Sequence, residues 1–319
     1  MSEKDIQTLI EKNMIEVGQN FKVTWCDREH DRESKFYEVM RLAKLGRLYL
    51  ARSTLLVTVF PPEMFQQYEA VYVLTYMFDG SMLKSYFDLF GLDYSKASIA
   101  TDSTGIQSLV PYNDDADIAF RNLCRELISV YDSPKLNRSG RTLSKSWYCE
   151  ANADTLKRLK NDVGEYFNRV LREAHASNDD IMWTCPTKFA DKISCKGYTC
   201  ARSMTVEEKR LPEQERKELE KKLSCFVPCN SKATNIYGNR WALAYCCNMF
   251  PQPLIRGMLE DCGVKYDRDA FALSCLVQWI CRSRIRNGNP ISIYIPSVRM
   301  RKLLVAWLTC GAPPSTSIS

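Results

Sequence analysis

The sequence predicts an α/β fold in which parallel sheets are flanked by helices. Segments with apolar residues at helical spacing alternate along the chain with short runs of β-branched and bulky apolar residues. One of these runs, Ala70–Tyr76, is apolar on both faces, which is typical of a central parallel strand covered by helices. With 319 residues, 45% hydrophobic and 26% charged, the chain is long enough for two ordinary domains or one large one.

In the first part of the chain, each predicted strand follows or precedes a predicted helix. Helical spacing predicts four helices, Met1–Asn20, Glu33–Leu45, Glu63–Tyr68 and Met82–Phe90. Strand-forming residues predict four strands, Phe21–Trp25, Leu48–Ala51, Thr54–Phe60 and Ala70–Tyr76. The last strand is followed by a polar loop and a helix, and ligands of α/β proteins bind where such strands end. The polar and small residues of Gly91–Ser103 indicate a boundary.

The alternation continues after this boundary. The predicted strands are Ile106–Pro111, Ile181–Cys185, Cys225–Val227 and Ile291–Ile295. The predicted helices are Asp114–Tyr131, Asp154–Ala174, Trp241–Phe250, Leu254–Cys262, Asp269–Arg286 and Val298–Leu308. Between them, Lys188–Lys222 is polar and of mixed charge, so we expect an exposed insertion. We expect a disordered tail over Gly311–Ser319.

Composition and charge exclude two classes of protein. No apolar run approaches the length of about 18 residues that a transmembrane helix needs, and the charged N-terminus, MSEKDIQTLIEKN, has no apolar core of a secretory signal. We therefore expect a cytoplasmic protein that does not use a membrane. The net charge of +6 and the isoelectric point of about 8.6 are compatible with nucleic-acid binding but do not require it.

Fourteen cysteines allow two interpretations. In a long chain without a secretory signal, reduced thiols in the cytoplasm are expected rather than disulfides. Two close pairs, Cys195 with Cys200 and Cys225 with Cys229, leave a zinc site as the alternative. Their spacing is wider than the usual C-x-x-C, and the two histidines, His30 and His175, are far from them in sequence. Buried or incidental thiols are the favoured interpretation, so zinc is not expected.

The helix predicted over Asp269–Arg286 carries a line of polar residues. Ser274, Gln278, Arg282 and Arg286 are each four residues apart, so successive side chains drift by only about 40° around a helix. The turn formers Asn287–Pro290 end the helix before the next strand. A helix that aligns a glutamine with two arginines could bind phosphate, and the alternative is a solvated basic face. Arg284 falls on the opposite face, where a structural or solvated role is expected.

Motifs of self-sufficient catalysis are missing. The phosphate cradle G-x-x-x-x-G-K-S/T does not occur, and no acidic motif follows a strand to hold magnesium. The sequence also has no G-x-S-x-G, H-E-x-x-H or G-x-G-x-x-G, and two distant histidines do not indicate a hydrolytic triad. The chain therefore contains at most half of a nucleotide site.

The order of the remaining features resembles a known family. A strand and loop that end in Ala233-Thr234-Asn235 precede the Gln278, Arg282, Arg286 helix and a last strand, as in the second RecA-like domain of superfamily-two helicases. More specifically, the chain resembles the C-terminal part of helicase-like ATPases carried by phages and mobile elements. The resemblance covers most of the chain after residue 45, and its most specific stretches are FVPCNSKATNIYGNRWALAYCCNMFPQP, DAFALSCLVQWICRSRIRNG and ISIYIPSVRMRKLL.

The resemblance implies an organisation and a set of roles. Residues 1–100 would be the remainder of a first RecA-like domain, and residues 101–310 a complete second one with the polar, cysteine-containing insertion around 188–225. Family members carry an N-terminal phosphate cradle and magnesium motif that this chain does not contain, so it is expected to begin after them. ATP and magnesium would bind only where a missing or separate half supplies the cradle. The expected partners are nucleic acid, DNA rather than RNA, and a protein that supplies the first-domain ATP site.

Individual roles follow from the same resemblance. The catalytic arginine-finger element would be Gln278, Arg282 and Arg286, which would face the nucleotide and stabilise the charge of the γ-phosphate. Nucleic acid would contact Thr184, Lys188, Thr234 and Asn235. Thr75 and Asp79 would lie in the loop that couples the ATP state to nucleic acid, although Thr75 also fits an ordinary strand residue. The alternative function is a non-catalytic nucleic-acid-binding, inhibitor or adaptor protein. Arg299, Arg301 and Lys302 could form a further phosphate-contacting patch or a solvated helix start.

Overall fold

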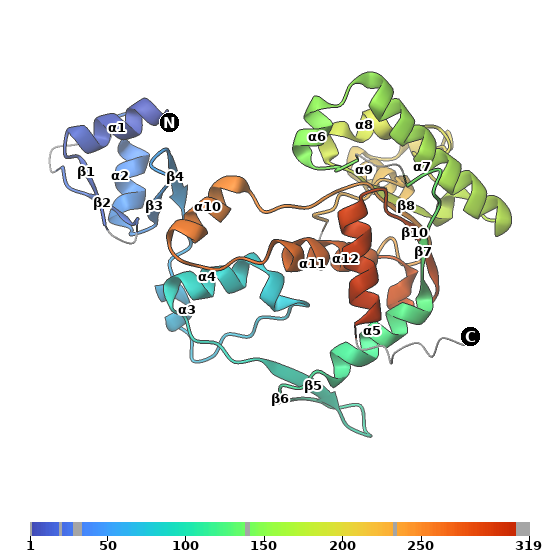
Figure 1. Cartoon of the computed structure of the whole chain (residues 1–319), viewed down its shortest axis with the longest axis horizontal. Helices are drawn as coiled ribbons and strands as arrows, with labels where there is room; N and C mark the ends of the chain where they lie inside the picture. The colour runs from blue at the N-terminus through green and yellow to red at the C-terminus, as the bar shows by residue number, and fades with distance from the viewer. Residues whose placement is uncertain (1, 19–20, 28–33, 138–140, 232–234, 311–319) are drawn as a thin grey trace. The chain divides into compact units, whose positions relative to one another are not determined.

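The computed structural model describes the chain except for residues 1, 19–20, 28–33, 138–140, 232–234 and 311–319 (Figure 1). Its contacts divide the chain into two compact units. Unit 1 comprises Met1–Ser95 and Phe250–Phe271, and unit 2 comprises Lys96–Met249 and Ala272–Ser319. Phe250–Phe271 fall within the predicted second domain, whereas by contacts these residues group with the first unit. Within the described ranges, no helix combines the length and apolar character needed to cross a membrane.

Unit 1 begins with two helices packed on two small antiparallel sheets. The helices are α1 (Glu3–Glu11) and α2 (Tyr37–Lys44), and the sheets pair β1 (Ile15–Val17) with β2 (Val23–Trp25) and β3 (Leu48–Ala51) with β4 (Leu55–Thr58). A hydrophobic core joins these elements through Ile6, Leu9, Ile15, Val23, Met40 and Leu50. The helix predicted over Met1–Asn20 is therefore too long, because the apolar residues after Glu11 belong to β1 instead.

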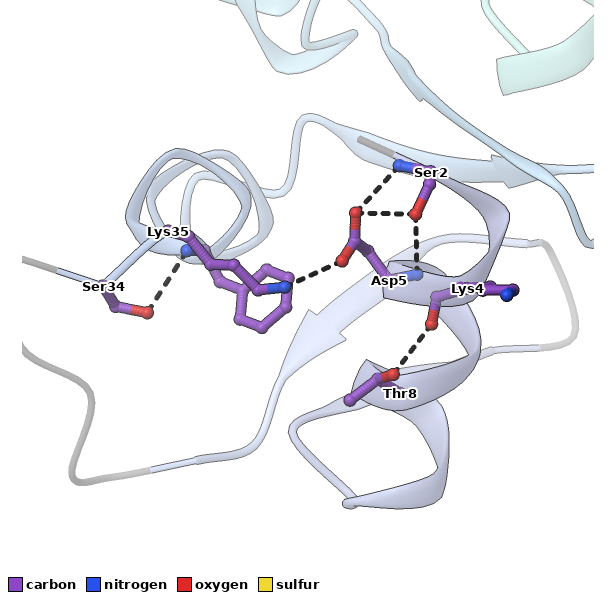
Figure 2. Close-up of polar contacts among 7 residues, drawn as sticks. Ser2, Lys4, Asp5, Thr8, Ser34 and Lys35 are labelled. Carbon is purple, nitrogen blue, oxygen red and sulfur yellow. Dashed lines mark hydrogen bonds and ion pairs between the residues drawn. The ribbon is translucent and has the colours of Figure 1, made fainter.

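Polar contacts fix the start of α1. Ser2 and Asp5 form a capping box, in which each side chain bonds to the backbone amide of the other residue (Figure 2). The ammonium group of Lys35 lies 2.8 Å from the Asp5 carboxylate (Figure 2). Lys35 and then Ser2 hold the pKa of Asp5 well below its ordinary value. The capping box satisfies amide groups that a helix start otherwise leaves unpaired.

The second half of unit 1 is held together by aromatic rings. It contains α3 (Glu63–Gln66), the 3₁₀ turn η1 (Phe78–Gly80), α4 (Met82–Phe90) and α10 (Pro253–Asp261). The rings of Phe65, Tyr86, Phe87, Phe78 and Tyr94 contact one another edge to face or tilted, with centroids 5.0–6.1 Å apart. Arg52 joins β3 and β4 to the end of α10 through ion pairs with Glu260 and Asp261, of 3.3 and 3.4 Å.

The prediction of a central strand over Ala70–Tyr76 is wrong. These residues have no regular secondary structure, and Tyr72 and Leu74 are 71% and 85% exposed. A strand needs a neighbour that pairs with its backbone, and no described strand pairs with this segment. High strand propensity alone therefore did not produce a strand.

We expect that replacing Gly80 by alanine destabilises unit 1 by about 1–3 kcal/mol. A Cβ atom at position 80 would lie 2.5 Å from the backbone oxygen of Ala270, so one of the two backbone segments has to move. The matched control is Gly164→Ala in a helix of unit 2, where the nearest atom would be a Tyr198 ring carbon at 3.7 Å. Peptide-resolved hydrogen exchange should be faster than in the unmodified chain around residues 78–90 of Gly80→Ala. It should be unchanged in Gly164→Ala. Equal exchange in both variants would contradict the prediction.

Unit 2 is built on a parallel sheet of four strands, β7 (Ile128–Tyr131), β8 (Ile181–Thr184), β9 (Ala242–Tyr245) and β10 (Ile291–Tyr294). Their order in the sheet is β7-β10-β9-β8, and all three pairings are parallel. Phe226 forms a parallel bridge with Trp183, which adds a short fifth segment beside β8. The predicted α/β class, with a parallel sheet flanked by helices, is confirmed.

Helices cover this sheet and lead into it (Figure 1). They are α5 (Asp115–Leu127), α6 (Lys145–Glu150), α7 (Ala153–Glu173), α8 (Ala190–Ile193), α9 (Glu213–Leu223), α11 (Arg268–Ile280) and α12 (Val298–Thr309). The α7 helix buries Leu159, Val163 and Phe167 against the sheet residues Ala242 and Ala244. On the other face of β9, the ring of Tyr245 contacts Trp279 of α11 edge to face, with centroids 5.3 Å apart. The sheet is therefore buried on both faces.

The remaining elements of unit 2 lie outside this sheet. An antiparallel hairpin pairs β5 (Ala97–Thr101) with β6 (Gln107–Pro111) before α5. Single 3₁₀ turns occur at η2 (Asn178–Asp180), η3 (Thr187–Phe189), η4 (Glu208–Arg210) and η5 (Arg284–Asn287). The predicted insertion around 188–225 contains α8, η4 and α9, and the tail predicted to be disordered lies outside the described residues.

Three predicted helices of unit 2 need correction. The last four residues of the helix predicted over Asp114–Tyr131 form β7, and Trp241–Phe250 contains β9 and has no helix. Short apolar runs fit a buried strand and a buried helix equally well, so periodicity could not separate them. The helix predicted to end at Arg286 ends at Ile280. There the hydroxyl of the buried Ser283 donates a hydrogen bond of 2.6 Å to the Ile280 carbonyl, which favours a turn over a further helical residue.

Candidate functional site

Two predicted site residues, Arg286 and Asn235, contact each other across loops that precede neighbouring strands. Residues 235–241 lead into β9, and residues 281–290 lead from α11 into β10. Because β9 and β10 pair in parallel, both loops lie at the amino-terminal edge of the sheet. Arg286 donates a hydrogen bond through Nη1 to Oδ1 of Asn235. The side-chain amide of Asn287 donates another, of 3.2 Å, to the Gly238 carbonyl, so the two loops are joined twice.

Arg282 lies beside Arg286, and no acidic side chain is among its neighbours in the part of the chain that the structure describes. Burial lowers the pKa of the Arg282 guanidinium, and the nearby charge of Arg286 lowers it further. Its other electrostatic neighbours among the described residues are Cys281 and Tyr237, neither of them a carboxylate. The buried Nε of Arg282 has no hydrogen-bond partner in the described part of the chain. Two guanidinium groups thus lie close together, and the described neighbours of Arg282 supply no carboxylate, an arrangement that favours an anion.

The other polar residues of the predicted line are arranged differently. Ser274 is only 5% exposed, and Gln278 is exposed near the end of α11. Because the helix ends at Ile280, Arg282 lies in a turn and Arg286 in η5, so the four side chains do not form one helical ridge. Arg284 holds the loop itself, since its Nε donates a 2.6 Å hydrogen bond to the Pro290 carbonyl.

The remaining predicted contacts lie elsewhere. Thr184 is the last residue of β8 and Lys188 follows in η3, both at the carboxyl-terminal edge of the sheet and away from the arginine pair. Lys188 is exposed, whereas Thr184 is fully buried, so a contact with nucleic acid would require the chain around it to move. Thr234 lies outside the described residues. Thr75 and Asp79 are exposed and belong to unit 1.

The carboxyl-terminal edge of the sheet contains further charged residues, among which Arg299 and Arg301 belong to the predicted patch. A buried ion pair joins Arg141, after β7, to Asp162 of α7, with Nη1 and Oδ2 2.6 Å apart. Arg299 donates a 2.7 Å hydrogen bond to Oδ1 of Asn248, and Arg301 donates one of 2.8 Å to the Ile295 carbonyl. The predicted patch at Arg299 and Arg301 is therefore bonded to the loops that follow β9 and β10. In the sequence, these residues are marked only by a basic loop that ends at Arg141 and by the basic start of the helix with Arg299 and Arg301.

The cysteines considered as zinc ligands are not gathered into one cluster. Among the described residues, no group of three or more histidine, cysteine, aspartate and glutamate side chains is placed to hold a metal. Cys225 is fully buried, its thiol donates to the Asn178 carbonyl, and burial raises its pKa to about 12. Cys229 lies three residues after Phe226, which bridges to β8, and is partly buried.

Comparison with known proteins gives the relationship of the chain. A family model described as the YonV C-terminal Rossmann-like domain matches residues 122–308, and a model of the YonV middle domain matches residues 1–58. The chain belongs to the YonV family. The SPbeta prophage-derived uncharacterized protein YonV of Bacillus subtilis (strain 168) is 34% identical over 316 residues, which cover 97% of this chain and 70% of that protein. No solved structure matches the chain.

These matches agree with the fold and with part of the predicted origin. The match to the Rossmann-like domain contains all four strands of the parallel sheet and the loops with Asn235, Arg282 and Arg286. The YonV relative is prophage-derived, which supports the predicted link to phages. The matches support the coarser Rossmann-like description, and they do not identify a superfamily-two helicase.

Proposed function

We propose that this YonV-family chain binds phosphate groups of DNA through Arg282, Arg286 and Asn235, as a helicase-like protein of prophage DNA metabolism. The observation that supports this proposal is that Arg282 lies beside Arg286 and that no carboxylate is among the described electrostatic neighbours of Arg282. Holding two guanidinium groups together costs free energy, and a phosphate bound between them recovers it. Asn235 orients one of the two groups before the ligand arrives, which reduces the entropic cost of binding.

The finer proposal is that the same residues complete an ATP site as arginine fingers. This chain lacks the phosphate cradle, so ATP and magnesium would be held by a separate first-domain partner. Arg282 and Arg286 would then stabilise the negative charge that develops on the γ-phosphate, with Gln278 nearby on α11. The resemblance to helicase-like ATPases supports these roles.

Binding of fluorescent DNA tests the first proposal. Arg282→Ala and Arg286→Ala should each weaken binding of a single-stranded or duplex oligonucleotide about tenfold, and lower the slope of log K against log salt by about 0.7–0.9. Fluorescence anisotropy between low and physiological salt gives both numbers. The control is Arg169→Ala, which removes an exposed arginine of the same unit that is paired with Glu173 over 3.0 Å. Equal affinities and slopes in all three variants would contradict the proposal.

A phosphate-release assay, with and without DNA, tests the half-site. We expect no ATP turnover by the purified chain alone, and turnover in a reconstituted system that depends on Arg282 and Arg286. Robust turnover by the chain alone would contradict the half-site. Loss of DNA binding in the two variants, without any nucleotide-linked activity in the reconstituted system, would favour the non-catalytic binding or adaptor alternative.

A further inference from the structure

Unit 1 contains an exposed segment that has the composition of a strand but pairs with no described strand. Residues 66–75 are all exposed, and residues 70–75 have no regular secondary structure. Within the described part of the chain, residues 70–75 make no hydrogen bond from backbone to backbone. The sequence AVYVLTY over Ala70–Tyr76 contains no proline, glycine or charged residue, and valine and tyrosine favour strands. Backbone groups of such a segment are open to pairing with another chain.

The exposure of the side chains alternates along this segment as it does along a strand. Val71 and Val73 are 44% and 39% exposed, whereas Tyr72 and Leu74 between and after them are 71% and 85% exposed. Alternate side chains of an extended chain lie on opposite faces, so one face of the segment is partly covered and the other faces solvent. The segment is thus already arranged for pairing, which lowers the entropic cost of association.

The exposed apolar area is close to that of a specific interface. Tyr72 and Tyr68, which is 64% exposed, leave on the order of 250 Å² of ring surface open. Val71, Val73 and Leu74 bring the exposed area to on the order of 500 Å². Pairing of the backbone buries further area, and specific interfaces bury about 600–1,000 Å² on each partner. A contiguous apolar patch of this size marks an interaction site.

We propose that two copies of this chain associate by antiparallel pairing of Ala70–Tyr76 with itself, around a two-fold axis at Val73. In this register Val73 lies opposite its own counterpart, and Tyr72 lies opposite Leu74 of the partner subunit. The two most exposed side chains of the segment therefore cover each other, and the symmetry forms this contact twice. Large apolar side chains that lie directly opposite each other stabilise an antiparallel pair of strands.

The charges around the segment favour a second copy as the partner. Like charges that lie directly opposite each other destabilise an antiparallel pair, and self-pairing brings them together unless the register separates them. In the register centred on Val73, the nearest charged residue, Glu69, lies opposite Met77 of the partner subunit, and Asp79 lies opposite Gln67. Self-pairing therefore brings no carboxylate against another, and the segment is complementary to its own copy.

Sedimentation velocity of the whole purified chain, over a range of micromolar concentrations, tests this pairing. We expect a dimer whose population rises with concentration. Val73→Asp and Val73→Lys should each weaken the dimer at least about tenfold, because like charges then face each other across the axis. An equal mixture of the two variants should restore the dimer, because opposite charges then face each other. The control is Val206→Asp in unit 2, which replaces a 67% exposed valine and should leave the dimer unchanged.

The outcomes of this experiment do not depend on the proposed function, because no nucleic acid is present. A chain that stays monomeric, or a dimer that persists in Val73→Asp, would overturn the proposal. Restoration by the mixture shows that both variants fold, and its failure would overturn the pairing of Val73 with its own counterpart. A monomeric chain in which Val73→Asp weakens DNA binding would assign the segment to nucleic acid and overturn the proposal as well.

Discussion

Replacing Arg141 by methionine is expected to lower the free energy of unfolding of unit 2 by about 3–5 kcal/mol. Its ion-pair partner Asp162 would then keep its buried carboxylate but lose the guanidinium 2.6 Å away. The side chains of Arg141 and Asp162 are only 7% and 6% exposed, so water cannot solvate the charge that remains. The pair also joins the loop after β7 to α7, which covers one face of the sheet. Loss of this ion pair should therefore lower the stability of unit 2 as a whole.

A double-mutant cycle separates the pair from its surroundings. Asp162→Leu alone should cost a similar amount, whereas Arg141→Met with Asp162→Leu should cost far less than the sum, because an apolar pair leaves no buried charge. Urea unfolding followed by tryptophan fluorescence measures the three variants. Lys135→Ala is the matched control, since Lys135 pairs with Glu165 of the same helix over 2.8 Å but is 69% exposed. It should change stability by less than about 1 kcal/mol. Additive costs in the double variant would contradict the prediction.

The sequence predicted most reliably those elements whose pattern extends over several turns or is bounded by turn residues. The helix expected over Asp154–Ala174 is α7, Ala153–Glu173, and its inner face was identified by its spacing. The strand expected over Ile291–Ile295 is β10, Ile291–Tyr294, because Asn287–Pro290 marks where it begins. In both cases local propensity and burial favour the same structure.

The failures occurred where the sheet itself decides the conformation. β7 follows α5 directly with no turn residue between them, and β9 has the sequence Ala-Leu-Ala-Tyr, in which alanine favours helix. Pairing with β10 on either side makes both segments strands. Ala70–Tyr76 shows the opposite case, a segment of strong strand propensity that no described strand pairs with. Strand formation depends on partners that are distant in sequence.

The geometry of the candidate site could not be predicted from the sequence. Asn235, Arg282 and Arg286 were named in advance, but the bond between Asn235 and Arg286 joins residues 51 positions apart. The burial of the Arg282 Nε depends on the end of α11 at Ile280, which periodicity placed six residues later.

Arg240→Met is expected to cost about 3–5 kcal/mol of unfolding free energy in unit 2. Arg240 is 5% exposed and donates hydrogen bonds to three backbone carbonyls, those of Ile181, Ser224 and Lys222, over 2.9, 2.6 and 2.7 Å. Its guanidinium also lies 5.0 Å from the centre of the Tyr237 ring. Methionine fills similar volume but leaves these carbonyls without their donor. Leaving a buried carbonyl without its charged donor costs more free energy than the hydrogen bond itself contributes, because water does not replace the lost donor.

The structure predicts where the damage from Arg240→Met should be greatest. Lys222 and Ser224 lie at the C-terminal end of α9, where a cation also compensates the negative end of the helix dipole. Hydrogen exchange should therefore accelerate most over 213–227 and at the start of β8, with a smaller change in α7. Arg240→Lys should recover little, since one ammonium group cannot reach three carbonyls as the planar guanidinium does. The control is Arg216→Met on the exposed face of α9, whose 3.9 Å contact with Glu220 contributes little. A loss below about 1 kcal/mol in Arg240→Met, or full rescue by lysine, would mean that the three bonds do not hold α9 to the sheet.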